Sequence, residues 1–223
     1  MGYGLAINSI SKKFKITDNL GYVGLIGVLF LIIYAYLSSI FIHHGQFHNS
    51  IILIIGLIFF VKFYFFNSKK KKEQWTYFFI IFLILLMGAF FLKTHDDFPY
   101  YHFSYSHYLT ENSLIFGMGH FNLGYRTPSS IFYLNSLFYL PFVKYFMFHM
   151  PAILIMGFSN LVLLIKLKKN IANNQINFIT YFTLLVLIFI NIFFYRISEH
   201  GTDKSAMILI FLLFIEIMLL SNF

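Results

Sequence analysis

Long uninterrupted runs of apolar residues, separated by short polar stretches, are the main feature of the chain. A membrane-spanning helix needs about 20 such residues, and six runs approach that length: Leu20–Ile42, Ile51–Phe66, Trp75–Leu92, Tyr145–Ile165, Phe178–Tyr195 and Ala206–Phe223. Their Phe, Ile and Leu residues are continuous rather than alternating, which is typical of helices in lipid. The pattern predicts an all-α, polytopic transmembrane bundle of about six spans.

The composition changes this picture only by excluding other classes of protein. Apolar residues make up 59% of the 223 residues and charged residues only 11%, whereas a soluble domain carries charge on about a quarter of its residues. The chain has no cysteine, which excludes disulfides, thiolate metal sites and cysteine nucleophiles. The net charge is +8. In a membrane protein, such an excess of lysine and arginine usually reflects which side of the membrane each loop occupies. We therefore expect membrane lipids and no nucleic acid among its partners.

Three clusters of lysine mark the ends of the apolar runs. The first cluster (residues 12–15) precedes the first run, the second (residues 69–72) separates the second and third runs, and the third (residues 166–169) follows the fourth. Because the chain crosses the membrane at each run, all three clusters fall on the same side, which the positive-inside rule makes cytoplasmic. The N-terminus is then also cytoplasmic.

This orientation divides the chain into a cytoplasmic segment at residues 1–19 and one transmembrane domain at residues 20–223, with an external loop at residues 93–144. It also places most side chains suited to acid–base chemistry on the external side. These are the nine histidines and five of the eight acids, namely Asp96, Asp97, Glu111, Glu199 and Asp203. We therefore expect the functional site on the external face.

The external loop carries three notable segments. Asp96 and Asp97 directly follow the third apolar run, where partial burial and mutual repulsion should raise the pKa of one of them. Neighbouring residues point about 100° apart on a helix, so only one carboxylate need face a site. A glycine-rich stretch at residues 117–126 ends in Arg126, and residues 130–140 predict an aromatic helix lying at the outer headgroups.

A second external segment is dense in charge. The nine residues Arg196-Ile-Ser-Glu-His-Gly-Thr-Asp-Lys204 hold two cations, a histidine and two acids. Arginine forms bidentate contacts with phosphate, so Arg196 and Lys204 could clamp a phosphate while His200 donates a hydrogen bond. The simpler interpretation is a solvated turn between two spans.

Several short motifs in the external loop resemble a known superfamily. The sequence Asp-Asp-x-x-Tyr-Tyr-His at residues 96–102 directly follows an apolar run, and Asn-Leu-x-x-Arg at residues 122–126 precedes the aromatic helix. This arrangement resembles the first external loop of GT-C glycosyltransferases. It is most similar to uncharacterised bacterial multi-spanning proteins of that superfamily, over roughly residues 75–205. The resemblance implies transfer of a sugar from a polyprenyl-phosphate carrier to a glycan or lipid acceptor. The reaction would occur at the outer face of the bacterial inner membrane, in surface glycan synthesis.

The resemblance also implies roles for single residues. Asp96 or Asp97 would be the general base that takes the acceptor proton, and Asp96 is favoured because the leading acid is usually the catalytic one in related loops. The sequence assigns no metal site, but aspartate pairs bind a divalent cation in some relatives, so this cofactor stays open. The substrate and its phosphate would be held by His102, Arg126, Arg196, His200 and Lys204.

The chain departs from the usual GT-C pattern in two respects. Two apolar runs precede the acidic pair instead of one, and the sixth run reaches Phe223, the last residue given. The resemblance therefore implies a reduced relative or a C-terminally truncated piece of a longer enzyme.

Other interpretations stay open. The acidic pair could be a hydrated helix cap, and Arg126 could anchor the loop to lipid phosphates. His43, His44 and His48 could contribute to a metal site, although their ligand set is incomplete, and Glu216 could be a packing or pore residue within the last run. The whole protein could instead be a polysaccharide polymerase or ligase, or a transport or assembly component without enzymatic activity.

Overall fold

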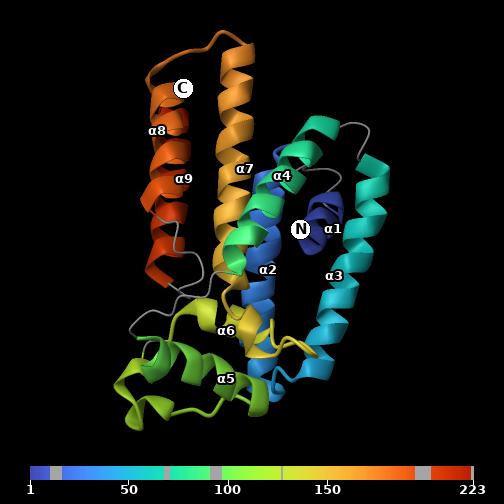
Figure 1. The fold of residues 1–223 in the computed structure, drawn as a ribbon, viewed down its shortest axis with the longest axis vertical. Coiled ribbons are helices and arrows are strands. Elements are labelled where there is room, and N and C mark those ends of the chain that lie inside the picture. The colour runs from blue at the N-terminus through green and yellow to red at the C-terminus, as the bar shows by residue number, and fades with distance from the viewer. Residues whose placement is uncertain (11–16, 68–70, 91–96, 127, 194–201, 222–223) are drawn as a thin grey trace.

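A computed structural model describes residues 1–10, 17–67, 71–90, 97–126, 128–193 and 202–221 (Figure 1). These residues form helices and no strand. Each of the six apolar runs forms a helix over most of its described residues, as predicted. They form α2 (Leu20–Phe41), α3 (Gln46–Asn67), α4 (Lys72–Ala89), α7 (Met150–Ala172), α8 (Phe178–Phe193) and α9 (Thr202–Ser221).

The helices are those of a membrane protein. Four stretches in the described part are long and apolar enough to cross a bilayer: Leu20–Phe41, Gln46–Phe65, Tyr145–Ala172 and Asp203–Ser221. Helix α8 is a shorter apolar helix of 16 residues, and α4 has 18 residues. These findings confirm the predicted all-α, multi-span bundle.

Helix α7 is the centre of the bundle and packs against α2, α4, α8 and α9. Its middle is fully enclosed, with Phe158, Leu161 and Leu163 all at most 1% exposed. The outer helices present apolar side chains outward instead, as at Leu57 and Leu83. This distribution suits a lipid environment, because lipid-facing helices have no need of a polar outer surface.

The N-terminal residues form a helix of their own, α1 (Gly2–Ile10), which lies between α2 and α3 (Figure 1). Gly4 permits this contact, because a Cβ at this position would lie 1.8 Å from the carbonyl oxygen of Val23. The Tyr3 hydroxyl donates a hydrogen bond of 2.6 Å to the carbonyl oxygen of Ile52 in α3. Residues 2–10 of the predicted cytoplasmic segment thus form a helix that contacts both α2 and α3.

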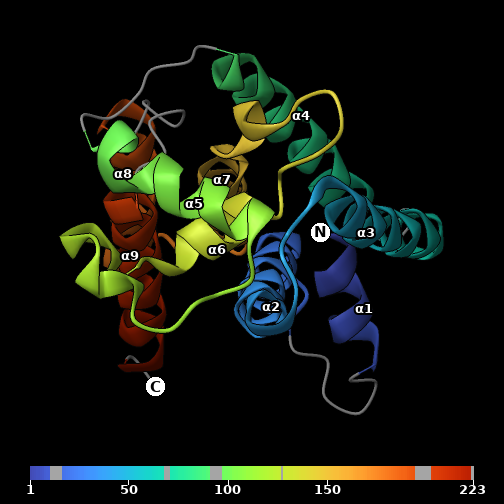
Figure 2. The same ribbon diagram turned by 90° about the horizontal axis from the view of Figure 1, so that it is seen from below.

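One end of the bundle is covered by a layer of short helices (Figures 1 and 2). We call it the end layer. Its elements are the π-helix η1 (Phe98–His102), α5 (Phe103–Glu111), the 3-10 helices η2 (Met118–His120), η3 (Leu123–Tyr125) and η4 (Tyr145–Met147), and α6 (Ser130–Ser136).

Helix α6 is the buried part of this layer. All residues from Ile131 to Leu137 are buried, because α5 packs against one side of α6 while α2 and α7 contact it from the bundle. The aromatic side chains that the layer exposes near α6 are instead in the following loop, where Phe142 is 100% exposed and Phe146 is 52% exposed. The surface anchor predicted for residues 130–140 thus lies just after them.

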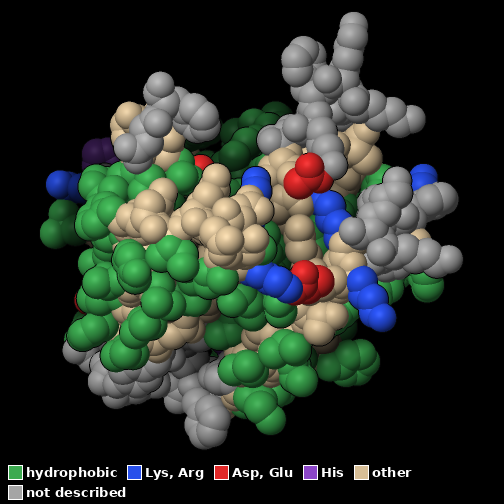
Figure 3. Space-filling view, turned by 90° about the horizontal axis from the view of Figure 1, so that it is seen from above, with side chains coloured by type: hydrophobic (Ala, Val, Ile, Leu, Met, Phe, Trp, Pro, Cys, Tyr) green, Lys and Arg blue, Asp and Glu red, His purple; other side chains and the backbone are tan. Residues whose placement is uncertain are grey.

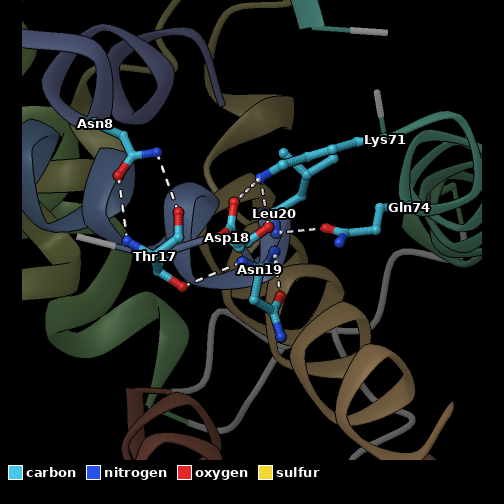
Figure 4. Close-up of polar contacts among 8 residues, drawn as sticks. Asn8, Thr17, Asp18, Asn19, Leu20, Lys71 and Gln74 are labelled. Atoms are coloured by element: carbon cyan, nitrogen blue, oxygen red, sulfur yellow. Dashed lines mark hydrogen bonds and ion pairs between the residues drawn. The ribbon is translucent and has the colours of Figure 1, made fainter. Parts of the chain in front are cut away.

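The opposite end of the bundle carries a group of lysines at the start of α4 and near the end of α7, and we call it the lysine-rich face (Figure 3). Lys168 pairs with Glu73, and Lys71 lies 3.4 Å from Asp18. Figure 4 shows that residues 17–20, at the start of α2, make hydrogen bonds to α1 on one side and to α4 on the other. Asn8 of α1 bonds to Thr17 through both its amide nitrogen and its amide oxygen, and Gln74 of α4 accepts a 3.0 Å bond from the backbone nitrogen of Leu20.

Candidate functional site

Asp97 begins the end layer at the position where the sequence analysis expected catalytic chemistry. It is the N-cap residue of η1, but its side chain makes no capping hydrogen bond. The carboxylate instead accepts a 3.3 Å hydrogen bond from the Tyr101 hydroxyl. The helix-cap interpretation of Asp97 therefore has no support from its side-chain geometry.

The element after Asp97 is itself unusual. Residues 98–102 form a π-helix that continues directly into α5, with Pro99 in its first turn. Proline is tolerated there because the first amide groups of a helix have no intrahelical acceptor. Single π-turns are rare and occur frequently at functional sites.

Tyr101 links Asp97 to two other predicted segments. Gly124 of the glycine-rich stretch packs on its ring, and a Cβ at Gly124 would lie 2.7 Å from the Tyr101 Cβ. Burial raises the pKa of Tyr101, and the nearby charges of Asp97 and Asp203 raise it further. Asp203 is in the first turn of α9, so η1 and the start of α9 are neighbours, as Figures 1 and 2 also show.

The glycine-rich stretch forms a hollow of about 420 Å³ next to this group. Arg126 and His120 line it together with Tyr105 and Tyr125. The Arg126 side chain is exposed and donates a 3.3 Å hydrogen bond from Nε to the carbonyl oxygen of Gly119. This bond does not use the two terminal nitrogens of the guanidinium group. An exposed guanidinium held in this way can bind a phosphate or carboxylate.

The other predicted site residues have different positions. His102 is only 4% exposed and its ring packs 5.0 Å from that of Phe132, so it lies behind Tyr101 in the core. Lys204 follows Asp203 in the first turn of α9. Asp96, Arg196 and His200 lie outside the described residues.

The histidines considered for a metal site have another role. His44 is fully buried, with Nε2 2.8 Å from the Ser38 hydroxyl and Nδ1 2.6 Å from the Ser136 hydroxyl. Asn49 donates to the carbonyl oxygens of both His44 and Ser136. Both ring nitrogens of His44 are therefore occupied, and no group of three metal-ligating side chains occurs in the described part of the chain.

This buried network fixes the end layer to the bundle. It joins α6, which contains Ser136, to the loop between α2 and α3, which contains His44. Burial, with smaller contributions from His48 and His43, lowers the pKa of His44 to about 3. His44 is thus neutral at physiological pH, and its role is to hold α6 in place beneath α5.

Sequence reasoning missed Tyr101 as a site residue. The available signal was its spacing of four residues from Asp97, because positions i and i+4 are neighbours on a helix. It also missed the 2.6 Å contact between the hydroxyls of Tyr105 and Tyr133, which joins α5 to α6. No local signal could have found that contact, because 28 residues separate the two tyrosines.

The fold and this site define an all-helical membrane protein whose acidic, tyrosine-linked site lies in a layer over one end of the bundle. The chain belongs to the family described as a domain of unknown function, DUF8201, whose family model matches residues 1–222. No curated protein matches the chain, and no solved structure matches it.

Proposed function

We propose that this chain is a membrane glycosyltransferase of the GT-C type. It transfers a sugar from a polyprenyl-phosphate carrier to a glycan or lipid acceptor, in the synthesis of a surface glycan. The observation that carries the proposal is the position of Tyr101, which hydrogen-bonds to Asp97, packs on the glycine-rich stretch and lies in the field of Asp203. Asp97, Gly124 and Asp203, one residue from each of three segments singled out in the sequence, thereby come close to the same tyrosine.

The chemistry follows from these side chains. A carboxylate of the acidic pair takes the proton from the acceptor hydroxyl, whose oxygen attacks the anomeric carbon of the sugar. The bond from that carbon to the phosphate oxygen breaks, and negative charge develops on the departing polyprenyl phosphate. Arg126 and Lys204 stabilise this charge, with Arg196 and His200 completing the predicted set. We assign no step to a divalent cation.

The proposed orientation places the end layer outside the bacterial inner membrane and the N-terminus in the cytoplasm. The second and third lysine clusters support it, because Lys71, Lys72, Lys166, Lys168 and Lys169 lie at the start of α4 and near the end of α7, at the opposite end of the bundle. The first cluster lies outside the described residues. The positive-inside rule then makes the lysine-rich face cytoplasmic. The acceptor and the sugar meet in the end layer, at the level of the external headgroups.

The test measures glycan transfer in membranes that carry each variant at matched abundance. The donor probes are radiolabelled glucose and mannose linked to polyprenyl phosphate. Loss of a general base typically lowers the rate 10²–10⁴-fold, so we expect Asp96→Asn or Asp97→Asn to cause such a loss. The Glu111→Gln variant is the matched control, because Glu111 is an exposed acid of the same layer. Transfer at the wild-type rate by the double variant Asp96→Asn/Asp97→Asn would overturn the proposal.

A further inference from the structure

Three polar side chains from three different helices meet near the lysine-rich face. Glu216 of α9 forms an ion pair with Lys166 of α7 and accepts a hydrogen bond from the Tyr22 hydroxyl of α2. The Lys166 ammonium also lies 5.7 Å from the centre of the Tyr22 ring. An acid within a membrane span is costly unless it is paired, and this pairing explains how Glu216 is accommodated there.

Two members of this trio, Tyr22 and Glu216, line a groove between α2 and α9. Both helices pack against α7, which forms the floor of the groove through Ile155. The groove has a volume of about 590 Å³, with Thr17, Tyr22 and Glu216 at its polar end. Its walls are apolar and include Leu25, Leu29, Ile32 and Leu209.

One oxygen of Glu216 is available to an occupant of this groove. Both described contacts of the carboxylate, from Tyr22 and from Lys166, use Oε1. The side chain is 38% exposed, so its second oxygen, Oε2, can face an occupant of the groove. The groove therefore offers an apolar channel that ends at a carboxylate able to accept a hydrogen bond.

We propose that this groove binds one molecule of phosphatidylethanolamine. Its ammonium group donates to Oε2 of Glu216, and one acyl chain lies along α2 and α9. From Tyr22 to Ile32 the helix rises about 15 Å, which is half of a hydrocarbon core of about 30 Å. The groove thus has the length of one leaflet, with its polar end at the headgroups of the lysine-rich face.

The charges select this lipid among the common phospholipids. The Glu216–Lys166 pair is neutral overall, so a zwitterionic headgroup leaves the site neutral. Phosphatidylcholine has the same charges but no N–H group, so it cannot donate to Oε2. Phosphatidylglycerol has no ammonium group, so it would add a net negative charge next to the Glu216 carboxylate, which is unfavourable.

The test counts bound lipid on the full chain in mild detergent by native mass spectrometry. The probes are dioleoyl-phosphatidylethanolamine and dioleoyl-phosphatidylcholine, titrated separately. Because a hydrogen bond to a charged group is stronger than one between neutral groups, we expect at least about tenfold tighter binding of the first lipid by the wild-type chain. Equal binding of the two lipids overturns the proposal without any mutation.

Variants then locate the site. We expect Glu216→Gln to abolish the preference between the two lipids, while Glu73→Gln preserves it. Glu73 is the matched control because it is also paired with a lysine but does not line the groove. We expect Leu29→Trp, at a position 56% exposed and lining the groove, to weaken binding of both lipids. A preference that survives Glu216→Gln, or binding unaffected by Leu29→Trp, would place the lipid elsewhere and contradict the proposal.

Discussion

The hydroxyl of Tyr101 lies 3.3 Å from Oδ2 of Asp97 and donates a hydrogen bond to it, four residues along the chain. This bond orients the carboxylate within the end layer, and it ties the acid to a side chain that also packs on Gly124. The same tyrosine therefore holds the carboxylate through its hydroxyl and contacts the glycine-rich stretch through its ring.

We predict that Tyr101→Phe lowers sugar transfer about tenfold, because it removes a hydrogen bond to a charged group worth about 1.5–3 kcal/mol. The loss should be smaller than that caused by removing the general base. Tyr100→Phe is the control, since Tyr100 is 71% exposed. Equal effects of the two substitutions would mean that the Tyr101–Asp97 bond has no role in transfer.

Arg126 provides a second test of the site. We predict that Arg126→Lys lowers transfer less than Arg126→Ala, because lysine keeps the positive charge but loses the planar fork that binds phosphate at two points. The measurement is the transfer rate as a function of donor concentration, and the defect should appear mainly in the maximal rate, because the charge that Arg126 stabilises develops as the phosphate departs. Identical rates for Arg126→Ala and the wild type would remove Arg126 from the proposed phosphate site.

The lowered pKa of His44 predicts how the free energy of unfolding depends on pH. Its pKa is about 3 in the folded protein and 6.5 as an ordinary histidine, so between these values the unfolded chain binds the proton more tightly. The contribution of neutral His44 to the free energy of unfolding is fully present above about pH 6.5. It decreases as the pH falls below this value, by up to about 1.4 kcal/mol per pH unit. Thermal unfolding in detergent from pH 7 to pH 4 should show this loss. The slope should become shallower in His44→Gln, while it should stay the same in His43→Gln, whose histidine is exposed. An unchanged slope in His44→Gln would contradict this assignment.

The packing of α1 predicts an unusual response to alanine. Alanine is normally a better helix former than glycine by about 1 kcal/mol, yet Gly4→Ala should destabilise the protein by about 1–3 kcal/mol, because the added methyl group meets the backbone of α2. Ile10→Ala on the same helix is the control, since Ile10 is 82% exposed. A melting temperature for Gly4→Ala at or above that of the wild type would show that α1 does not pack against α2 in this way.

Orientation can be tested with single cysteines, because the chain contains none. Asn112 in the end layer and Asn173 at the lysine-rich face are both exposed. We predict that a membrane-impermeant maleimide added to intact cells labels Asn112→Cys and not Asn173→Cys. Lysis before labelling should expose both positions equally. The opposite pattern on intact cells would reverse the proposed orientation and with it the side on which the site lies.

Some features of this protein follow from the sequence alone. The six apolar runs determined six helices because a hydrocarbon environment requires each span to satisfy its own backbone hydrogen bonds over a fixed length. This is a local property, so it can be read from consecutive residues. The acidic pair and the glycine-rich stretch were also recognisable as local motifs, and their predicted roles stay predictions.

Only the tertiary structure decided which distant side chains meet. Glu216 is paired with Lys166, which is 50 positions away on another helix, and His44 lies between two serines of which one is 92 positions away. Helix α1 packs in the bundle because Gly4 meets the backbone of Val23, although residues 2–10 alone give little sign of it. Such contacts depend on how helices approach one another, and that approach is set by the shapes of both surfaces together.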